Sequence, residues 1–467
     1  MSSDRGPSLL ALARRGLVLS ALIAEAAWVY LLYRLVSRGT LRRDPDWLAR
    51  RFGRFAARFV RVASRLRGGL IKLGQVASLR VDVIPESITN ELARLQDRVD
   101  PQPFAPIARQ IERELGRPLA DCFASLEPVA IAAASLGQVH RGVDREGRPC
   151  AVKVLYPGVE RSVAVDLRML RLALWLFDPL VAPDLLSVHA QLARSLLREM
   201  DYLAEGRAAE RVAEGIARDG KLAAQVCIPR IRWETTSRRV LTMELIVGDK
   251  INDREALEAR GVDVAERVAW ATRAFLHQMF QERFFHCDPH PGNLLVDRAG
   301  RVAIVDFGMH EEIAPEIMEG VRMNVLAAVR RDETLWVESL ITVGILREKD
   351  RDAARALARL SFDPAYYNLT PRELAEIDIG DYFDRVREHL WLIEGARMPD
   401  GLLAFGRAFS LLYGLALELA PGLRPLEVVG PYVLAFLQPK RPIEGDGSPG
   451  LGAAGTRLPG AVPPPSC

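Results

Sequence analysis

The chain has 467 residues, of which 49% are hydrophobic and 26% are charged. This is the composition of a folded globular protein, and it excludes wholesale disorder and a polytopic membrane protein. Five scattered cysteines, odd in number and without a C-x-x-C pair, argue against a disulfide framework or a structural zinc site. They indicate a reducing compartment.

The charge is unevenly distributed along the chain. Residues 1–67 carry 14 arginines against four acidic residues, a net charge of +10, whereas the whole chain carries only +3. A basic terminus on an acidic body favours an anionic partner surface, either a membrane or a nucleic acid. We expect no nucleic acid, because the terminus lacks interleaved surface aromatic residues and a known binding module.

The first predicted element is a mostly apolar segment, residues 16–33, interrupted by Glu25. Its length is near the lower limit for a membrane span, and a carboxyl group in mid-span is costly. Basic residues follow it, so we expect no signal-peptide cleavage site, and a spanning segment would keep the body of the protein on the cytoplasmic side. Three interpretations stay open: an interfacial helix, a single span, or a helix packed on the protein's own core.

A second amphipathic helix is predicted next, over about residues 50–66. Arginines and apolar residues recur there at spacings of three and four, which places them on adjacent stripes of one helix. The arginines are Arg50, Arg54, Arg58, Arg61 and Arg65, and the apolar residues are Phe52, Phe55, Phe59, Val62 and Leu66. A membrane-binding helix and a helix docked on the body with a solvated arginine face both fit this pattern.

The middle of the chain predicts an α+β organisation in two lobes. Strands are expected over residues 129–139 and 151–155 around a turn at 144–148, then helices over about 162–217 with a break near 178–183. A second strand pair is expected over residues 226–233 and 239–245. After the junction at residues 244–248, helical periodicity dominates residues 262–437, apart from strand-like pieces at 294–296 and 302–305. The last 29 residues hold seven Pro and six Gly, which predicts a disordered tail.

The strongest motif is an H-x-D-x-x-x-x-N segment from His286 to Asn293, followed by Asp306-Phe307-Gly308. Phosphoryl transfer from a nucleotide needs a carboxylate that orients the attacking oxygen, together with oxygen ligands for magnesium. The segment supplies the carboxylate, Asp288, and one metal ligand, Asn293. Asp306 supplies the second metal ligand. A lone D-F-G is weak, but both elements flanking a predicted hairpin are a strong signal.

Lys153 stands in an otherwise apolar predicted strand, Ala151-Val152-Lys153-Val154. A buried lysine is costly unless it is paired, so we expect a carboxylate or phosphate partner. Kinases hold the α- and β-phosphates with such a lysine, which a helix glutamate orients. Glu199 and Glu205 are the candidate partners, and both follow Lys153 by 46 residues or more, so a helical insertion must separate them.

An alanine-rich loop stands where a glycine-rich phosphate loop would be expected. Alanine is stiffer than glycine and does not adopt positive φ freely, so the phosphates would be held differently. Glu244, at the junction of the two lobes, is a further candidate ATP-binding residue. The loop candidates are Ala132, Ala133, Ala134, Ser135, Leu136, Gly137, Gln138 and Val139.

These motifs, with Lys72-Leu73-Gly74-Gln75, resemble the atypical kinases of the UbiB, ABC1 or ADCK family, over about residues 65–437. The resemblance implies a bilobal protein-kinase-like fold with an N-terminal helical K-x-G-Q extension that occupies the place of a protein substrate. It assigns Lys72 and Gln75 to the active site beside Asp288. Glu199 and Glu205 become the acids that pair with Lys72 and Lys153, in an order left open.

The resulting domain prediction has five parts. These are basic N-terminal helices and candidate membrane anchor (1–67), K-x-G-Q extension (68–120), N-lobe with helical insertion (121–247), helical C-lobe (248–438) and tail (439–467). No A-P-E segment follows Asp306, and the short stretch at 309–317 leaves little room for an activation loop.

The family resemblance implies an ATP-binding, magnesium-dependent ATPase or kinase that supports ubiquinone biosynthesis or membrane lipid homeostasis. Its expected partners are ATP, an anionic membrane surface, and quinone-biosynthesis proteins or lipid. A nucleotide-binding pseudokinase scaffold and a small-molecule phosphotransferase are the alternatives. A His-based metal site is not expected, because the remaining histidines show no ligand spacing.

Overall fold

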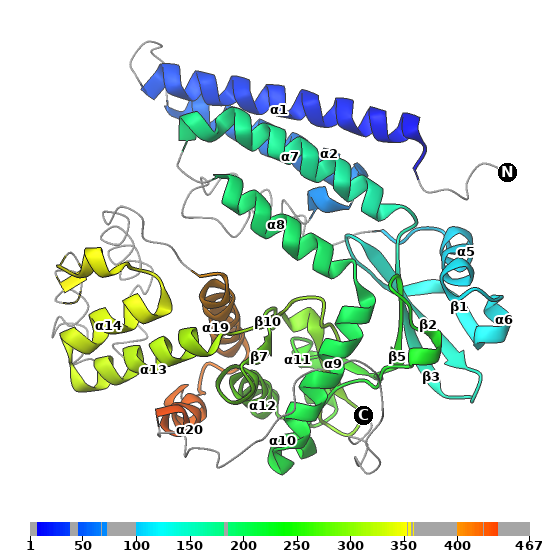
Figure 1. The fold of residues 1–467 in the computed structure, drawn as a ribbon. Coiled ribbons are helices and arrows are strands. Elements are labelled where there is room, and N and C mark those ends of the chain that lie inside the picture. The colour runs from blue at the N-terminus through cyan, green and yellow to red at the C-terminus, as the bar shows by residue number, and fades with distance from the viewer. Residues whose placement is uncertain are drawn as a thin grey trace, which may run out of the picture. The chain divides into compact units, whose positions relative to one another are not determined.

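The computed structural model describes residues 7–37, 45–66, 68–71, 100–181, 185–352, 354–355, 358, 399–423 and 425–437. The chain divides into two compact units, each built from separate stretches of sequence. Unit 1 comprises residues 1–209 and 229–246, and unit 2 comprises residues 210–228 and 247–467. Figure 1 shows the helices and strands of both units. The predicted tail at residues 439–467 lies outside the described residues.

Unit 1 contains a four-stranded antiparallel sheet in the order β1-β2-β3-β5 (Figure 1). The predicted strand over residues 129–139 is wrong, because that stretch holds the end of one strand, a turn and the start of the next. The N–H of Ala134 donates to the carbonyl of Gly137 at 2.8 Å and closes this turn. The strands are β1 (Phe123–Ala133), β2 (Gly137–Asp144), β3 (Pro149–Leu155) and β5 (Val240–Glu244).

The second predicted strand pair is only partly correct. Residues 230–232 pair with β5, since the N–H of Arg232 donates to the carbonyl of Thr242 and the N–H of Glu244 to that of Arg230, both at 2.8 Å. The 3₁₀ turn η1 (Trp233–Thr235) lies between them. The preceding strand β4 (Val226–Cys227) instead pairs in parallel with a strand of unit 2. Pro229 separates the two pieces, and it has no N–H with which to continue a ladder.

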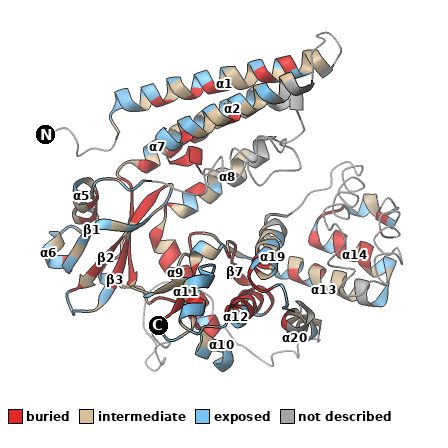
Figure 2. Cartoon of the chain, turned by 180° about the vertical axis from the view of Figure 1, so that it is seen from behind, coloured by how far each residue is buried: buried red, intermediate tan, exposed pale blue. Residues whose placement is uncertain are grey.

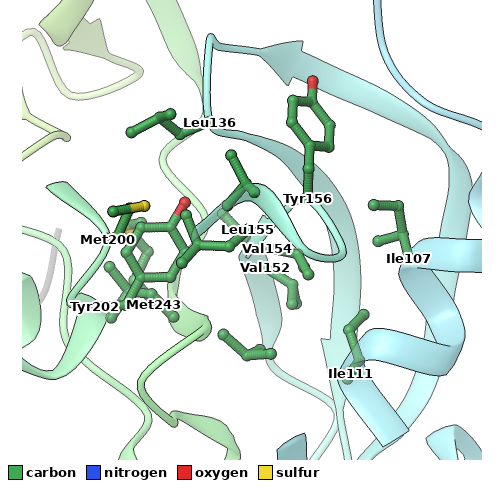
Figure 3. Close-up of a cluster of buried hydrophobic side chains, with 14 of the residues drawn as sticks. Ile107, Ile111, Leu136, Val152, Val154, Leu155, Tyr156, Met200, Tyr202 and Met243 are labelled. Atoms are coloured by element: carbon green, nitrogen blue, oxygen red, sulfur yellow. The ribbon is translucent and has the colours of Figure 1, made fainter. Parts of the chain in front are cut away.

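The core of unit 1 packs against β3. Val152, Val154 and Leu155 are fully buried, and Figure 3 shows them beside Ile107 and Ile111 of helix α5 (Phe104–Leu115). The two isoleucines are four residues apart, so they lie on one face of the helix. α5 ends at Gly116, whose φ of 68° is the left-handed conformation that glycine adopts without strain. The short helix α6 (Leu119–Cys122) follows and leads into β1.

The predicted helical insertion of unit 1 is present. It consists of α7 (Val159–Val181), α8 (Leu185–Glu199) and the first turns of α9 (Tyr202–Ala217). α7 continues through the predicted break at Asp178-Pro179, and Pro183 lies outside the described residues. The two N-terminal helices, α1 (Leu9–Ser37) and α2 (Pro45–Leu66), run alongside α7 (Figure 1). A small apolar cluster joins these helices, and it includes Leu19, Leu22 and Ala63.

Helix α1 is covered on one face only (Figure 2). Leu19, Leu22 and Leu32 are buried, whereas Trp28 and Leu31 are 55% and 47% exposed. Glu25, the predicted mid-span carboxyl, lies 3.0 Å from Arg58 of α2. Among the described residues, α1 is the one helix long and apolar enough to cross a membrane. Its packing therefore combines a protein-facing side with an apolar side left open.

The predicted stripes of α2 are confirmed. Its five spaced arginines are all exposed, and its five spaced apolar residues are half-buried. Ala56 and Ala63, seven residues apart, make the fully buried line of the helix. Small residues at these positions allow the helix to pack closely, while the arginines remain in solvent.

Unit 2 is mainly helical, with two small sheets. One sheet has the order β4-β9-β8-β6, and the other pairs β10 with β7. The predicted strand pieces at residues 294–296 and 302–305 are confirmed as a hairpin. The strands are β6 (Gly248–Lys250), β7 (Phe284–His286), β8 (Leu294–Asp297), β9 (Val302–Ile304) and β10 (His310–Glu312).

A buried helix lies beside these strands and ends in a π-helical turn, η2 (Gln278–Glu282). This helix, α12 (Val264–His277), packs against α19 (Asp400–Leu419) and α20 (Pro425–Leu437). Phe280 of η2 contacts Phe405 of α19 with ring centroids 5.6 Å apart. The other elements of unit 2 are α10 (Gly220–Gln225), α11 (Arg254–Ala259), η3 (Pro291–Asn293), α13 (Pro315–Arg330), α14 (Glu333–Val343), η4 (Glu348–Asp350), α19 (Asp400–Leu419) and α20 (Pro425–Leu437).

Candidate functional site

Lys153 in the middle of β3 has the carboxylate partner that its burial predicts. Its Nζ lies 2.7 Å from Oε1 of Glu205, and the two side chains are only 14% and 3% exposed. The ammonium also lies 5.2 Å from the ring centroid of Tyr202, which begins the helix that carries Glu205. Of the two glutamates that the sequence leaves open, Glu205 therefore pairs with Lys153. Glu199 ends α8 and is half-buried.

The alanine-rich loop is the tight turn between β1 and β2. Ala132 pairs with Val139 and Ala133 with Gln138, which places the turn at residues 134–136. Among the described residues, the only non-glycine residues with positive φ are Arg283 and Arg331. The turn is thus made without left-handed backbone, so alanine serves there without strain.

Gly137 is the loop residue that must be glycine. A Cβ at this position would lie 2.4 Å from the carbonyl oxygen of Val154 and 2.8 Å from the hydroxyl of Tyr202. The backbone of β2 therefore approaches β3 closely, one residue along from Lys153. Leu136 has a structural role as well. Its side chain is buried in the core, and its carbonyl accepts from the N–H of Tyr156 at 2.9 Å.

The Gln138 side chain points into a buried polar network rather than toward the turn. Its Oε1 accepts from the N–H of Gln102 at 2.7 Å, and its Nε2 donates to Nε2 of His140 at 2.8 Å. The other ring nitrogen of His140 donates to the carbonyl of Glu127 at 2.8 Å, and burial lowers the pKa of this histidine. Only the main chain of Gln138 therefore borders the alanine turn.

The remaining N-lobe candidate, Glu244, lies at the end of β5. Its register partner is Cys150 of β3, and its carboxylate accepts from the N–H of Arg230 at 3.4 Å. The side chain is thus used to hold the neighbouring segment beside the end of the strand.

In unit 2, His286 joins the two predicted phosphoryl-transfer motifs. Its Nδ1 accepts from the N–H of Asp288 at 2.9 Å, and its Nε2 donates to the carbonyl of Asp306. The ring is completely buried, which lowers its pKa and keeps it neutral with the proton on Nε2. A single buried ring therefore bonds both to the main chain of Asp288 and to the main chain of Asp306.

Asn293 and Asp306 stand at the same end of the β8–β9 hairpin. The N–H of Val305 donates to the carbonyl of Asn293 at 3.0 Å, so residue 306 follows directly on this pair. The Asn293 amide nitrogen donates to the carbonyl of Asp288 at 3.1 Å, which leaves its Oδ1 as the atom for a cation. One oxygen of Asp306 accepts from the N–H of Gly308 at 2.9 Å, which orients the carboxylate.

These two side chains fit a magnesium ion that is shared with phosphate groups. Carboxylate and amide oxygens are the ligands that Mg²⁺ prefers, and it is usually held by one or two protein groups plus substrate phosphates. Within the described residues, no group of three or more His, Cys, Asp or Glu could hold a metal alone. The oxygens of Asn293 and Asp306 are the groups that would hold such an ion.

The segment after Asp306 is short and fixed. β10 pairs with β7, with His310 opposite His286, and the carbonyl of Met309 accepts from the N–H of Cys287 at 2.9 Å. Arg211 makes two hydrogen bonds with Glu312 at 2.9 and 3.0 Å. Helix α13 begins at Pro315, so the structure agrees with the prediction of little room for an activation loop.

Lys72 and Gln75 of the K-x-G-Q motif lie outside the described residues. The turn immediately before them is described, and the N–H of Gly68 donates to the carbonyl of Ser135 at 3.2 Å. The approach to the motif is therefore attached to the alanine-rich turn.

Sequence reasoning missed one charged contact at the candidate catalytic carboxylate. Arg407 of α19 lies with a terminal guanidinium nitrogen 3.3 Å from Oδ1 of Asp288. The two residues are 119 positions apart, and the residues around Arg407 form an ordinary helical pattern. No local signal relates it to the H-x-D segment.

Comparison with known proteins agrees with this geometry. The model of the ABC1 atypical kinase-like domain matches residues 94–340, more than half of the chain. The chain belongs to this family. The predicted family and the predicted α+β, protein-kinase-like fold class are thereby confirmed.

Individual relatives cover most of this chain. ACTIVITY OF BC1 COMPLEX KINASE 3, chloroplastic, of Arabidopsis thaliana is 34% identical over 378 residues, which cover 80% of this chain and 52% of the relative. The Synechocystis protein sll1770 is 33% identical over 373 residues, covering 79% and 62%. The chain thus spans between half and two thirds of these relatives' lengths. A solved structure, Rv3197 with erythromycin from Mycobacterium tuberculosis, matches with a TM-score of 0.47 and 22% identity, covering 81% of this chain and 95% of that one.

Proposed function

We propose that the chain is a MgATP-dependent kinase or ATPase. The observation that carries the proposal is the arrangement in unit 2, where His286 ties the loop of Asp288 and Asn293 to the backbone of Asp306. The hydrogen bonds that fix the backbone around Asp288, Asn293 and Asp306 support their assignment as proton acceptor and metal ligands. The intact Lys153–Glu205 pair of unit 1 supports nucleotide binding, because kinases hold the nucleotide phosphates with a lysine that a helix glutamate orients.

Each side chain has a distinct proposed role. Asp288 accepts the proton of the attacking oxygen, and Lys153, held by Glu205, neutralises charge on the nucleotide phosphates. The oxygens of Asn293 and Asp306 hold the magnesium ion. When bound, Mg²⁺ supplies charge neutralisation at the phosphate oxygens.

ATP turnover by the purified chain tests this proposal. We expect slow hydrolysis, and Asp306→Asn should suppress it by about two orders of magnitude or more, because it removes a metal carboxylate. Glu319→Gln is the matched control, since it makes the same chemical change on α13, at a carboxylate paired with Arg322. Equal ATP turnover in Asp306→Asn and wild type would contradict the assignment of Asp306 as a metal ligand.

We further propose that the activity supports ubiquinone biosynthesis or membrane lipid homeostasis. The resemblance carried by the K-x-G-Q motif, the alanine-rich loop and the H-x-D and D-F-G segments supports this class of pathway. A metabolite profile of a deletion strain provides the test. Unchanged quinone and lipid pools, with no accumulated intermediate, would contradict it.

We propose that unit 1 attaches to the anionic cytoplasmic face of a membrane through its N-terminal helices. The open apolar side of α1 and the exposed arginines of α2 support this. Arg15 of α1 is buried in an ion pair with Asp166 of α7, which favours a helix lying at the surface over one that spans.

A further inference from the structure

The ion pair between Arg407 and Asp288 is an unexpected contact at the candidate catalytic loop. It joins a guanidinium nitrogen to Oδ1 of Asp288 at 3.3 Å, with the two side chains 32% and 25% exposed. Both residues belong to unit 2, so the contact lies within one compact body.

Arg407 is carried by a well-anchored part of α19. Its neighbour Ala408 is fully buried, and Phe405 packs against Phe280 and Phe285 with ring centroids 5.6 and 6.3 Å apart. The main chain of Asp288 is held separately by His286 and Asn293. The backbone and one carboxylate oxygen of Asp288 are therefore both fixed, while Oδ2 accepts no hydrogen bond from any described residue.

The catalytic loop supplies no cation of its own. Residues 286–293 contain neither lysine nor arginine, and His290 uses its Nδ1 to accept from the N–H of Gly292 at 3.1 Å. Arg407 is permanently charged and offers several planar donors. Its Nε is buried and has no hydrogen-bond partner among the described residues, so it retains donor capacity beside Asp288.

We propose that Arg407 is a positioning residue for phosphoryl transfer, acting through Asp288; this rests on the proposed function. It holds Oδ1 so that Oδ2 faces the attacking water or hydroxyl. In the step, the attacking oxygen forms a bond to the γ-phosphorus and its proton passes to Oδ2. The bond from the γ-phosphorus to the bridging oxygen breaks, and its electron pair leaves with ADP.

Steady-state ATP turnover in matched variants tests the proposal. We expect Arg407→Gln to lower kcat about 10- to 100-fold with KM changed less than about 3-fold, because the pair acts on the reacting step and not on nucleotide binding. Arg407→Lys should recover part of the loss, since it keeps the charge without the planar fork. Arg254→Gln is the control, because Arg254 donates to the carbonyl of Leu419 at the far end of the same helix.

The decisive comparison is the double variant Arg407→Gln/Asp288→Asn. If Arg407 acts through Asp288, the double variant has the kcat of Asp288→Asn alone, and the melting temperatures measured without nucleotide show coupling of the two changes. Wild-type kcat in Arg407→Gln, or an equal loss in both backgrounds, overturns this proposal while leaving the proposed function intact. No turnover by the wild type overturns both.

Discussion

Arg15 of α1 and Asp166 of α7 form a two-point ion pair that is almost completely removed from solvent. Nε and one terminal nitrogen of Arg15 each lie 2.6 Å from a different oxygen of Asp166. The remaining terminal nitrogen donates to the carbonyl of Leu66 at 2.6 Å, and Asp166 also accepts from the N–H groups of Gly69 and Leu70. The pair therefore joins α1, α7, the end of α2 and the turn that leads to Lys72.

Arg15→Ala is expected to lower the free energy of unfolding by about 3–5 kcal/mol, because it leaves the buried charge of Asp166 unpaired. Arg14→Ala, the adjacent exposed arginine, should change it by less than about 0.5 kcal/mol. Urea denaturation of both variants measures the difference. The prediction is contradicted if the two substitutions have equal effects, or if Arg15→Ala/Asp166→Leu is less stable than Arg15→Ala.

Membrane attachment is expected to depend on the open side of α1. Removing residues 1–36 should release much of the protein from vesicles, but it also removes the partner of Asp166. Trp28→Ser/Leu31→Ser is a sharper variant, since both side chains are about half exposed and the Arg15 contact is untouched. Flotation with and without anionic lipid measures binding. Equal flotation of wild type and the double variant would show that these residues do not contact lipid.

The wild type is expected to phosphorylate generic peptides poorly or not at all, as the K-x-G-Q extension implies. Ala134→Gly should loosen the alanine turn and change nucleotide preference or expose autophosphorylation, because glycine widens the accessible backbone. Ala130→Gly, on β1 outside the turn, is the control. Phosphate transfer to peptides and nucleotide affinity are the measurements, and robust peptide phosphorylation by the unmodified chain would argue against occlusion.

Stability is expected to fall as the pH is lowered below about 6.5, the pKa of histidine in an unfolded chain. Burial lowers the pKa of His140 in the folded state, so the unfolded chain binds the proton first and acid favours unfolding. His140→Gln should flatten the dependence of the unfolding free energy on pH between 7.5 and 5.5. If the unfolding free energy of this variant keeps the wild-type slope against pH, other titratable groups cause the pH dependence and the prediction for His140 is wrong.

The family could be predicted from the sequence because its motifs are local. The H-x-D and D-F-G segments identify themselves by spacing, and their hairpin is recognisable from two short apolar runs. The start of the helix that carries Glu205, the partner of Lys153, also has a local signal. Asp201 accepts from the N–H of Ala204 at 3.1 Å and so caps α9, which places Glu205 in its first turn.

The features that escaped prediction depend on distant pairing. β4 resembles the start of a hairpin with β5, but it pairs with β9, about 76 residues later, and no local pattern encodes that choice. Arg407 reaches Asp288 in the same way, through helix packing. The roles of Lys72 and Gln75 and the five-part domain division stay predictions.

The chain passes between its two units three times, near residues 209, 228 and 246. Neither unit can therefore be cut out as one continuous fragment. A piece starting at residue 247 would lack β4 and expose the edge of β9, while a piece ending at residue 209 would lack β5, the strand beside Lys153. During synthesis, the sheet around Lys153 stays incomplete until β5, which follows the stretch containing β4, has emerged. Split-protein reporters and single-lobe expression are consequently poor tools for this molecule.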